Sequence, residues 1–89
     1  MSNLKLSILI PAFNEELVIN KLLKGLKESF VGVEDYEVVI IDDGSINLLI
    51  NEIHKDLLTD NVKVIRNKFN LGQTSSIKIG IEKSEGNII

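Results

Sequence analysis

The sequence predicts an α/β protein built on a doubly wound, mostly parallel sheet. Short runs of branched apolar residues alternate with segments whose apolar residues recur every three or four positions, which is the pattern of strand followed by helix. The strand-like runs are almost continuously apolar, as expected for parallel strands covered on both faces. Right-handed crossovers then place helices against the sheet. The length of 89 residues indicates a single domain, residues 1–89.

The first half of the chain contains a strand, a helix and a second strand. Residues 4–10 are mostly apolar and stop at Pro11, which has no N–H to donate to a ladder. Residues 15–30 carry apolar side chains at helical spacing, and Asn14 is a candidate cap for that helix. Residues 37–41 form the second strand.

The second half repeats the pattern. Helical spacing is carried by Ile46, Leu49, Ile50, Ile53 and Leu57. Ser45 directly precedes this helix and is expected to cap it. Residues 62–66 form a third strand, and a third helix runs over residues 74–83 with Thr74 as its cap. Residues 87–89 open a fourth strand.

Composition excludes several classes of protein. The 13 acidic and 10 basic residues give a net charge of −3, which argues against a nucleic-acid partner. There is no cysteine, so disulfides and thiolate metal sites are excluded and a reducing compartment is expected. The N-terminal apolar run is too short for a signal peptide, and no stretch reaches the length of a membrane span. We expect a cytoplasmic protein, located in its full-length form at the cytoplasmic face of a membrane.

Three loops follow the carboxyl ends of the predicted strands, at residues 11–15, 42–45 and 67–74. Because parallel strands end at the same edge of a sheet, these loops should lie together. Ligands of open α/β sheets bind at this edge. The loops are therefore the candidate site.

Asp42 and Asp43 are adjacent acids at the end of the second strand. Rossmann-like folds present an acid at this place to a ribose hydroxyl or a base, and a carboxylate can accept hydrogen bonds from two vicinal hydroxyls. The alternative is structural: one aspartate caps the next helix and the other is solvated. The two residues alone support both interpretations equally.

The other two loops carry further candidates. Pro11 fixes one backbone angle, so neighbouring backbone groups could face a ligand. Asn14 and Glu15 could face it too, although both are ordinary residues for a helix start. Gly72 permits close backbone approach, and Gln73 could read a ligand through its amide. A plain strand-to-helix loop explains each of these residues singly.

Motifs of several nucleotide-binding and hydrolytic classes are missing from the sequence. It contains no G-x-G-x-x-G dinucleotide turn, no G-x-x-x-x-G-K-[ST] P-loop and no G-x-S-x-G elbow. A nucleotidyltransferase of similar fold would need a phosphate loop rich in glycine and lysine after the first strand, where this chain reads PAFNEE.

Taken together, SILIPAFNEE, EVVIIDDGS and VKVIRNKFNLGQTSSIKIGIEKSEGNII resemble the N-terminal half of a family 2 glycosyltransferase with the GT-A fold. The resemblance covers nearly the whole chain with the motifs in register. The last segment is most similar to the branch that transfers sugars to polyprenyl or dolichyl phosphates. The resemblance implies a partial GT-A sheet with strand order 3-2-1-4.

The resemblance also implies which residues bind the nucleotide of a UDP- or GDP-sugar. They are Pro11, Ala12, Asn14, Glu15, Asp42, Asp43, Gly72 and Gln73. Asp43 is the first choice for the contact to the base. The family's D-x-D motif, which holds a divalent metal (Mg or Mn), is expected beyond Ile89, so we expect no catalytic residue and no metal ligand in this chain.

The chain departs from the family in one loop and leaves one alternative open. Many members read D-D-G-S-T-D-G-T where this chain reads DDGSINLL. We expect weak nucleotide binding, no transferase activity by the 89 residues alone, a lipid phosphate as a candidate acceptor, and self-association through an exposed sheet edge. The alternative is a small, non-catalytic α/β binding or interaction module.

Overall fold

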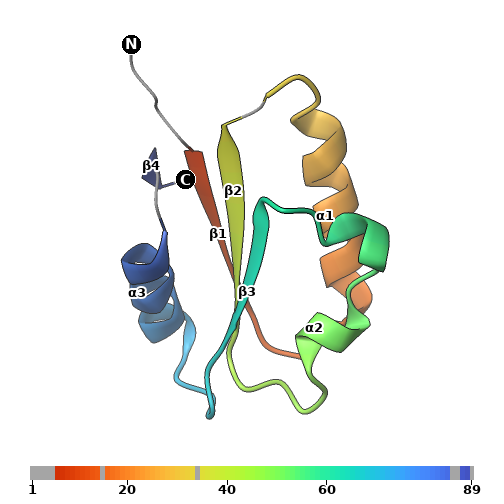
Figure 1. The fold of residues 1–89 in the computed structure, drawn as a ribbon. Coiled ribbons are helices and arrows are strands. Elements are labelled where there is room, and N and C mark those ends of the chain that lie inside the picture. The colour runs from red at the N-terminus through yellow and green to blue at the C-terminus, as the bar shows by residue number, and fades with distance from the viewer. Residues whose placement is uncertain (1–5, 15, 34, 85–86, 89) are drawn as a thin grey trace.

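The computed structural model describes residues 6–14, 16–33, 35–84 and 87–88, and these form one parallel sheet with helices on both sides (Figure 1). The strands are β1 (Leu6–Ala12), β2 (Tyr36–Asp42), β3 (Val62–Arg66) and β4 (Asn87–Ile88). They stand in the order β3-β2-β1-β4, and every pairing is parallel. β4 contributes two residues, which pair with Leu6 and Ser7. The predicted parallel α/β sheet is confirmed, with its three long strands in the predicted order.

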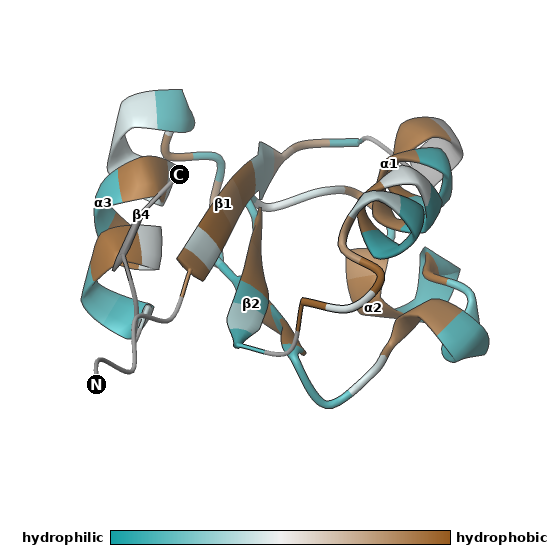
Figure 2. Ribbon diagram, turned by 90° about the horizontal axis from the view of Figure 1, so that it is seen from above, coloured by the Kyte–Doolittle hydropathy of each residue, from teal (hydrophilic) through white to brown (hydrophobic). Residues whose placement is uncertain are grey.

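The helices cover both faces of this sheet, as in a doubly wound fold. They are α1 (Glu16–Ser29), α2 (Leu49–Glu52), the 3-10 turn η1 (Lys55–Leu57) and α3 (Gln73–Lys83). α3 packs on one face, against β1 and β2, while α1 and α2 lie on the other (Figures 1 and 2). None of the helices in the described ranges is long and apolar enough to cross a membrane.

β2 lies at the centre of the core because it has a strand on each side and helices on both faces. Val38, Val39, Ile40 and Ile41 are all buried. Val38 and Ile40 pack with α1 and the α2–η1 segment. On the other face, Gly80 lets α3 come close to the sheet, since a Cβ there would lie 2.8 Å from Ile41 Cδ1.

The second predicted helix is wrong as a single element. The structure has one turn of α-helix in α2 and one 3-10 turn in η1, with Ile53 and His54 extended between them. The cause is Asn20 of α1: its Nδ2 donates to the Glu52 carbonyl at 2.8 Å, and its Oδ1 accepts from the His54 N–H at 2.7 Å. A side chain from another helix thus takes backbone groups that a continuous helix would need.

The predicted apolar spacing nevertheless marks the buried residues of this segment. Leu49, Ile53 and Leu57 belong to the core, whereas Ile46 and Ile50 are exposed. The pattern therefore recorded which side chains face inward, and it did not distinguish a helix from two short turns.

The predicted helix caps also differ from the structure. Ser45 does not cap α2, which begins at Leu49. Thr74 lies inside the first turn of α3, which is preceded by Gly72. The Asn14 Oδ1 accepts a hydrogen bond from the Ile46 N–H of another loop instead. The local sequence predicted capping by these side chains, but Asn14 and Ser45 instead form hydrogen bonds between loops.

Candidate active site at the carboxyl edge of the sheet

The three predicted loops meet at the carboxyl edge of the sheet. Asn14 joins the β1–α1 loop to the β2–α2 loop: its N–H donates to Ser45 Oγ at 2.8 Å, and its Oδ1 accepts from the Ile46 N–H at 2.9 Å. Gly44, with φ of 77°, packs on the β3–α3 loop so closely that a Cβ would lie 2.8 Å from the Asn70 N and from the Phe69 carbonyl carbon. The expected gathering of the loops is confirmed.

Asp42 holds the β2–α2 loop. It is the last residue of β2 and is buried. Its Oδ1 accepts from the Ser45 N–H at 3.0 Å, and its Oδ2 accepts from the Leu49 N–H at 3.1 Å and from Arg66 Nη1 at 2.8 Å. Arg66 also donates to the Ser45 carbonyl at 2.9 Å through Nη2. Asp42 therefore fixes the start of α2 and the end of β3.

Asp43 holds a different loop. Its Oδ1 accepts from Asn67 Nδ2 at 2.9 Å and from the Leu71 N–H at 2.8 Å, and its Oδ2 accepts from the Gly72 N–H at 2.8 Å. Successive side chains along a strand point to opposite faces. Asp42 therefore binds the β2–α2 loop, whereas Asp43 binds the β3–α3 loop. Their adjacency is tolerated because each has its own donors.

Both aspartates remain charged in spite of burial. Burial alone would raise the pKa of Asp42, but hydrogen bonds from Ser45 and Leu49 and the charge of Arg66 together hold that pKa below its ordinary value. Burial likewise opposes ionisation of Asp43, and the donors from the β3–α3 loop outweigh it, so its pKa is also lowered. The structural alternative of one solvated aspartate is wrong, since both are buried, although Asp42 does bind the first N–H of α2.

A hollow of about 280 Å³ opens between the loops. It is lined by Pro11, Ala12, Phe13, Asp43, Asn70, Gly72 and Gln73. Five of these residues are among the predicted nucleotide-binding residues. Asn14 and Asp42 do not line the hollow; they form hydrogen bonds that hold the adjacent β2–α2 loop. Glu15 lies outside the described residues.

The sequence did not single out Phe13 and Asn70. Phe13 is a large apolar residue within an otherwise small and polar loop, and it is half-exposed in the structure. That contrast is a signal that could have identified it, because an aromatic ring left in solvent at a candidate site needs an explanation. Asn70 enters the hollow through the packing of its loop on Gly44, which the sequence alone does not show.

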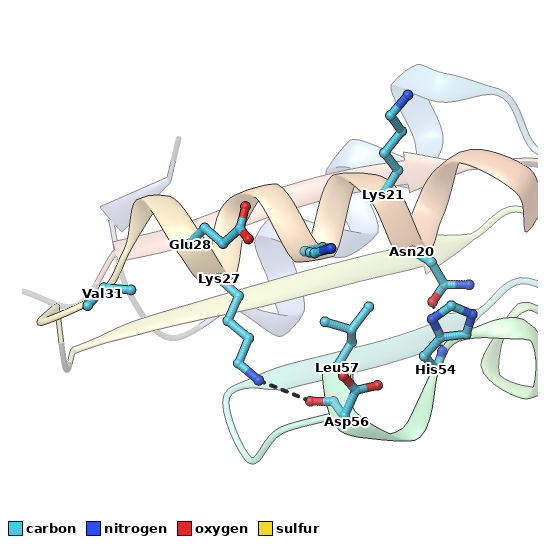
Figure 3. A pocket seen from close by; sticks show the side chains of 9 residues that line it. Asn20, Lys21, Lys27, Glu28, Val31, His54, Asp56 and Leu57 are labelled. Carbon is cyan, nitrogen blue, oxygen red and sulfur yellow. Dashed lines mark hydrogen bonds between the residues drawn. The ribbon is translucent and has the colours of Figure 1, made fainter.

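A larger hollow of about 570 Å³ lies between α1 and η1 (Figure 3). Its walls are joined by Lys27, whose Nζ donates to the Asp56 carbonyl at 3.3 Å, and by Asn20, which lies beside His54. Leu57 faces α1 between these contacts. None of the predicted site residues lines this hollow, and we place the functional site at the carboxyl edge.

The residues that the structure describes include no cluster of three or more His, Cys, Asp or Glu side chains able to hold a metal ion.

The hollow lies outside the carboxyl ends of the strands, which is the place where open α/β sheets bind their ligands. Residues 7–89 match the family described as glycosyl transferase family 2. The chain belongs to this family.

Individual relatives agree with the family match. The chain is 35% identical over 89 residues to the uncharacterized glycosyltransferase YkcC of Bacillus subtilis (strain 168), covering 98% of this chain and 28% of the relative. It is 34% identical over 87 residues to an undecaprenyl-phosphate 4-deoxy-4-formamido-L-arabinose transferase of Pseudomonas fluorescens (strain Pf0-1), covering 93% of this chain and 25% of the relative. The chain thus spans about a quarter of the length of such relatives.

A solved structure shows the same fold. The crystal structure of S. aureus TarS 1-349 superposes with a TM-score of 0.75 at 30% sequence identity, covering 97% of this chain and 27% of that chain.

Proposed function

We propose that this chain is the nucleoside-binding part of a glycosyltransferase that takes its sugar from a UDP- or GDP-sugar. The observation that carries the proposal is the hollow at the carboxyl edge, where three loops meet around the charged carboxylate of Asp43. Membership of glycosyl transferase family 2 supports it.

The lining offers complementary contacts to a nucleoside. The half-exposed ring of Phe13 can stack on a base. The Gln73 amide can both donate and accept hydrogen bonds, which suits the edge of a base. Asp43 can accept from a ring N–H or a ribose hydroxyl, and it also shapes the wall of the pocket because it binds the N–H groups of Leu71 and Gly72.

Asp42 and Asn14 have supporting roles in this proposal. The Asp42 carboxylate is directed to Ser45, Leu49 and Arg66, so the geometry favours Asp43 over Asp42 for direct contact with the nucleoside. Asn14 ties the Pro11–Phe13 side of the pocket to the β2–α2 loop.

The size of the hollow suits part of a nucleotide-sugar. Pockets that enclose a drug-sized ligand measure roughly 300–1,000 Å³, and this one measures about 280 Å³. We therefore propose that the nucleoside binds in this hollow and that the diphosphate and the sugar extend out of it. Such partial enclosure fits weak binding by the 89 residues alone.

The remaining steps of transfer are assigned to the whole enzyme, because the chain spans only about a quarter of its relatives' length. We propose that the whole enzyme uses a divalent metal, Mg or Mn, to stabilise the leaving diphosphate. A lipid phosphate is the proposed acceptor, in keeping with the relative named as an undecaprenyl-phosphate transferase. We propose a site of action at the cytoplasmic face of a membrane, and no sugar transfer by the 89 residues alone.

Calorimetric titration of UDP and GDP into wild type and two neighbouring variants tests the proposal. Gln73 lines the hollow and Thr74, the next residue, does not, although both side chains are exposed. Gln73→Ala should weaken binding of the preferred nucleotide about five- to tenfold, the effect of about one hydrogen bond, while Thr74→Ala should bind as wild type does. Equal affinities for wild type and Gln73→Ala, or no binding of either nucleotide, would overturn the assignment.

A further inference from the structure

Four large apolar side chains protrude from two of the carboxyl-edge loops. Ile46 and Leu48 of the β2–α2 loop are 85% and 44% exposed, and Phe69 and Leu71 of the β3–α3 loop are 72% and 50% exposed. We call these four residues the apolar rim. A cluster of this kind on a soluble surface usually marks a contact with a partner or a membrane.

The two loops that carry the apolar rim are fixed against each other. Gly44 packs on the backbone of Phe69 and Asn70. Arg66 at the end of β3 donates to the Ser45 carbonyl at 2.9 Å, and Asp43 at the end of β2 binds the Leu71 N–H at 2.8 Å. The rim residues therefore project from a single ordered edge.

The charges near the apolar rim suit an anionic surface. Within the described ranges 43–48 and 67–72, the one charged side chain exposed to solvent is Lys68, because Asp43 is buried among its donors. No exposed carboxylate in these two ranges would oppose a lipid phosphate. Apolar side chains that enter the interface, together with a lysine at the level of the headgroups, are the chemistry of peripheral membrane binding.

The loop after β2 reads DDGSINLL, which places Ile46 and Leu48 on the rim with the uncharged Asn47 between them. Two exposed apolar side chains without a negative charge between them favour contact with an anionic bilayer.

We infer that the apolar rim docks the protein on an anionic lipid bilayer, with Ile46, Leu48, Phe69 and Leu71 entering the interface and Lys68 facing the lipid phosphates. The inference does not depend on nucleotide binding. It concerns a surface beside the pocket, and vesicle binding and nucleotide binding are measured separately.

Single tryptophan reporters test the inference directly, because the chain contains no tryptophan. Ile46→Trp and Phe69→Trp place the reporter on the rim. Val31→Trp is the matched control, since Val31 is 80% exposed in the loop between α1 and β2, at the opposite end of the sheet (Figure 1). Vesicles of phosphatidylglycerol and phosphatidylcholine should shift the rim emission to shorter wavelength and leave the control unchanged. Unshifted rim reporters, or equal shifts at all three positions, would overturn the inference.

Co-sedimentation with the same vesicles measures the contribution of each group. Ile46→Ser and Phe69→Ser should each weaken binding at least about fivefold, whereas Val31→Ser should not. Lys68→Glu should weaken it too, with Lys78→Glu on α3 as its control, and pure phosphatidylcholine should bind less than the anionic mixture.

A second copy of the chain is the competing occupant of the apolar rim. Sedimentation velocity without lipid distinguishes a second copy from a bilayer as the occupant. If Ile46→Ser or Phe69→Ser dissociates an oligomer, the rim is an interface between copies, and the membrane inference is wrong. Unchanged sedimentation together with weakened vesicle binding supports it.

Discussion

Asp42 and Asp43 are neighbours in the chain, and each is the anchor of a different loop. Alternation along the strand sends Asp42 to the β2–α2 loop and Arg66, and Asp43 to Asn67 and the backbone of the β3–α3 loop. The pair was predictable as a feature of the site, because two acids at the end of an apolar strand are unusual. Their donors were not predictable, since four of the residues that bind them lie in loops without a regular pattern, namely Ser45, Asn67, Leu71 and Gly72.

The lowered pKa of Asp43 predicts a stability that depends on pH. Its folded-state pKa lies below the unfolded value of about 3.9, so the stabilisation is complete above that value and is lost as pH falls through the folded pKa. Asp43→Asn should cost about 1–3 kcal/mol at neutral pH and less in acid, where wild type loses the same charge. Urea unfolding at the two pH values measures this, with the exposed Asp60→Asn as control. An equal cost at both pH values would contradict the prediction.

Gly44 is predicted to be intolerant of a side chain. Gly44→Ala places a methyl group 2.8 Å from the backbone of Asn70 at a positive φ, whereas Gly32→Ala meets a similar φ of 85° with nothing within 4 Å. The difference between the two variants isolates the contact between loops. We expect Gly44→Ala to be at least about 1 kcal/mol more destabilised than Gly32→Ala in thermal or urea unfolding. Similar stabilities would show that the loops do not press together.

At the scale of elements, periodicity identified the strands and two of the helices, because burial on a regular face dominates there. It failed for residues 46–57, where Leu49, Ile53 and Leu57 are buried at helical spacing without a continuous helix. The reason is a contact distant in sequence: Asn20 binds the Glu52 carbonyl and the His54 N–H. Loop geometry and capping partners depend on contacts between residues that are distant in sequence. The local pattern of a single sequence does not predict such contacts.

Asn20 is therefore predicted to hold the α2–η1 segment against α1. Asn20→Ala removes both bonds and should cost about 1–2 kcal/mol, with faster amide hydrogen exchange over residues 49–57. Asn51→Ala is the control, because Asn51 is an exposed residue of α2. Unchanged exchange over 49–57 would mean that packing of Leu49, Ile53 and Leu57 holds the segment without Asn20.

At the scale of the molecule, the sheet leaves edges available for pairing. β4 covers β1 only at Leu6 and Ser7, and in the described part of the chain no strand pairs with the outer edge of β3. Exposed edges of parallel strands invite association. We therefore expect self-association through a sheet edge that grows with concentration in sedimentation equilibrium, and rim variants such as Ile46→Ser should leave it unchanged. A monomer at all concentrations would contradict this expectation.

Mapping the binding site of UDP and GDP on the 89-residue chain by amide chemical shifts tests whether the carboxyl edge of the sheet binds a nucleoside. We expect the shifts to concentrate in residues 12–14, 43–44 and 70–73, which surround the hollow at Asp43. Shifts confined to the hollow between α1 and η1, or none at saturating nucleotide, would contradict it.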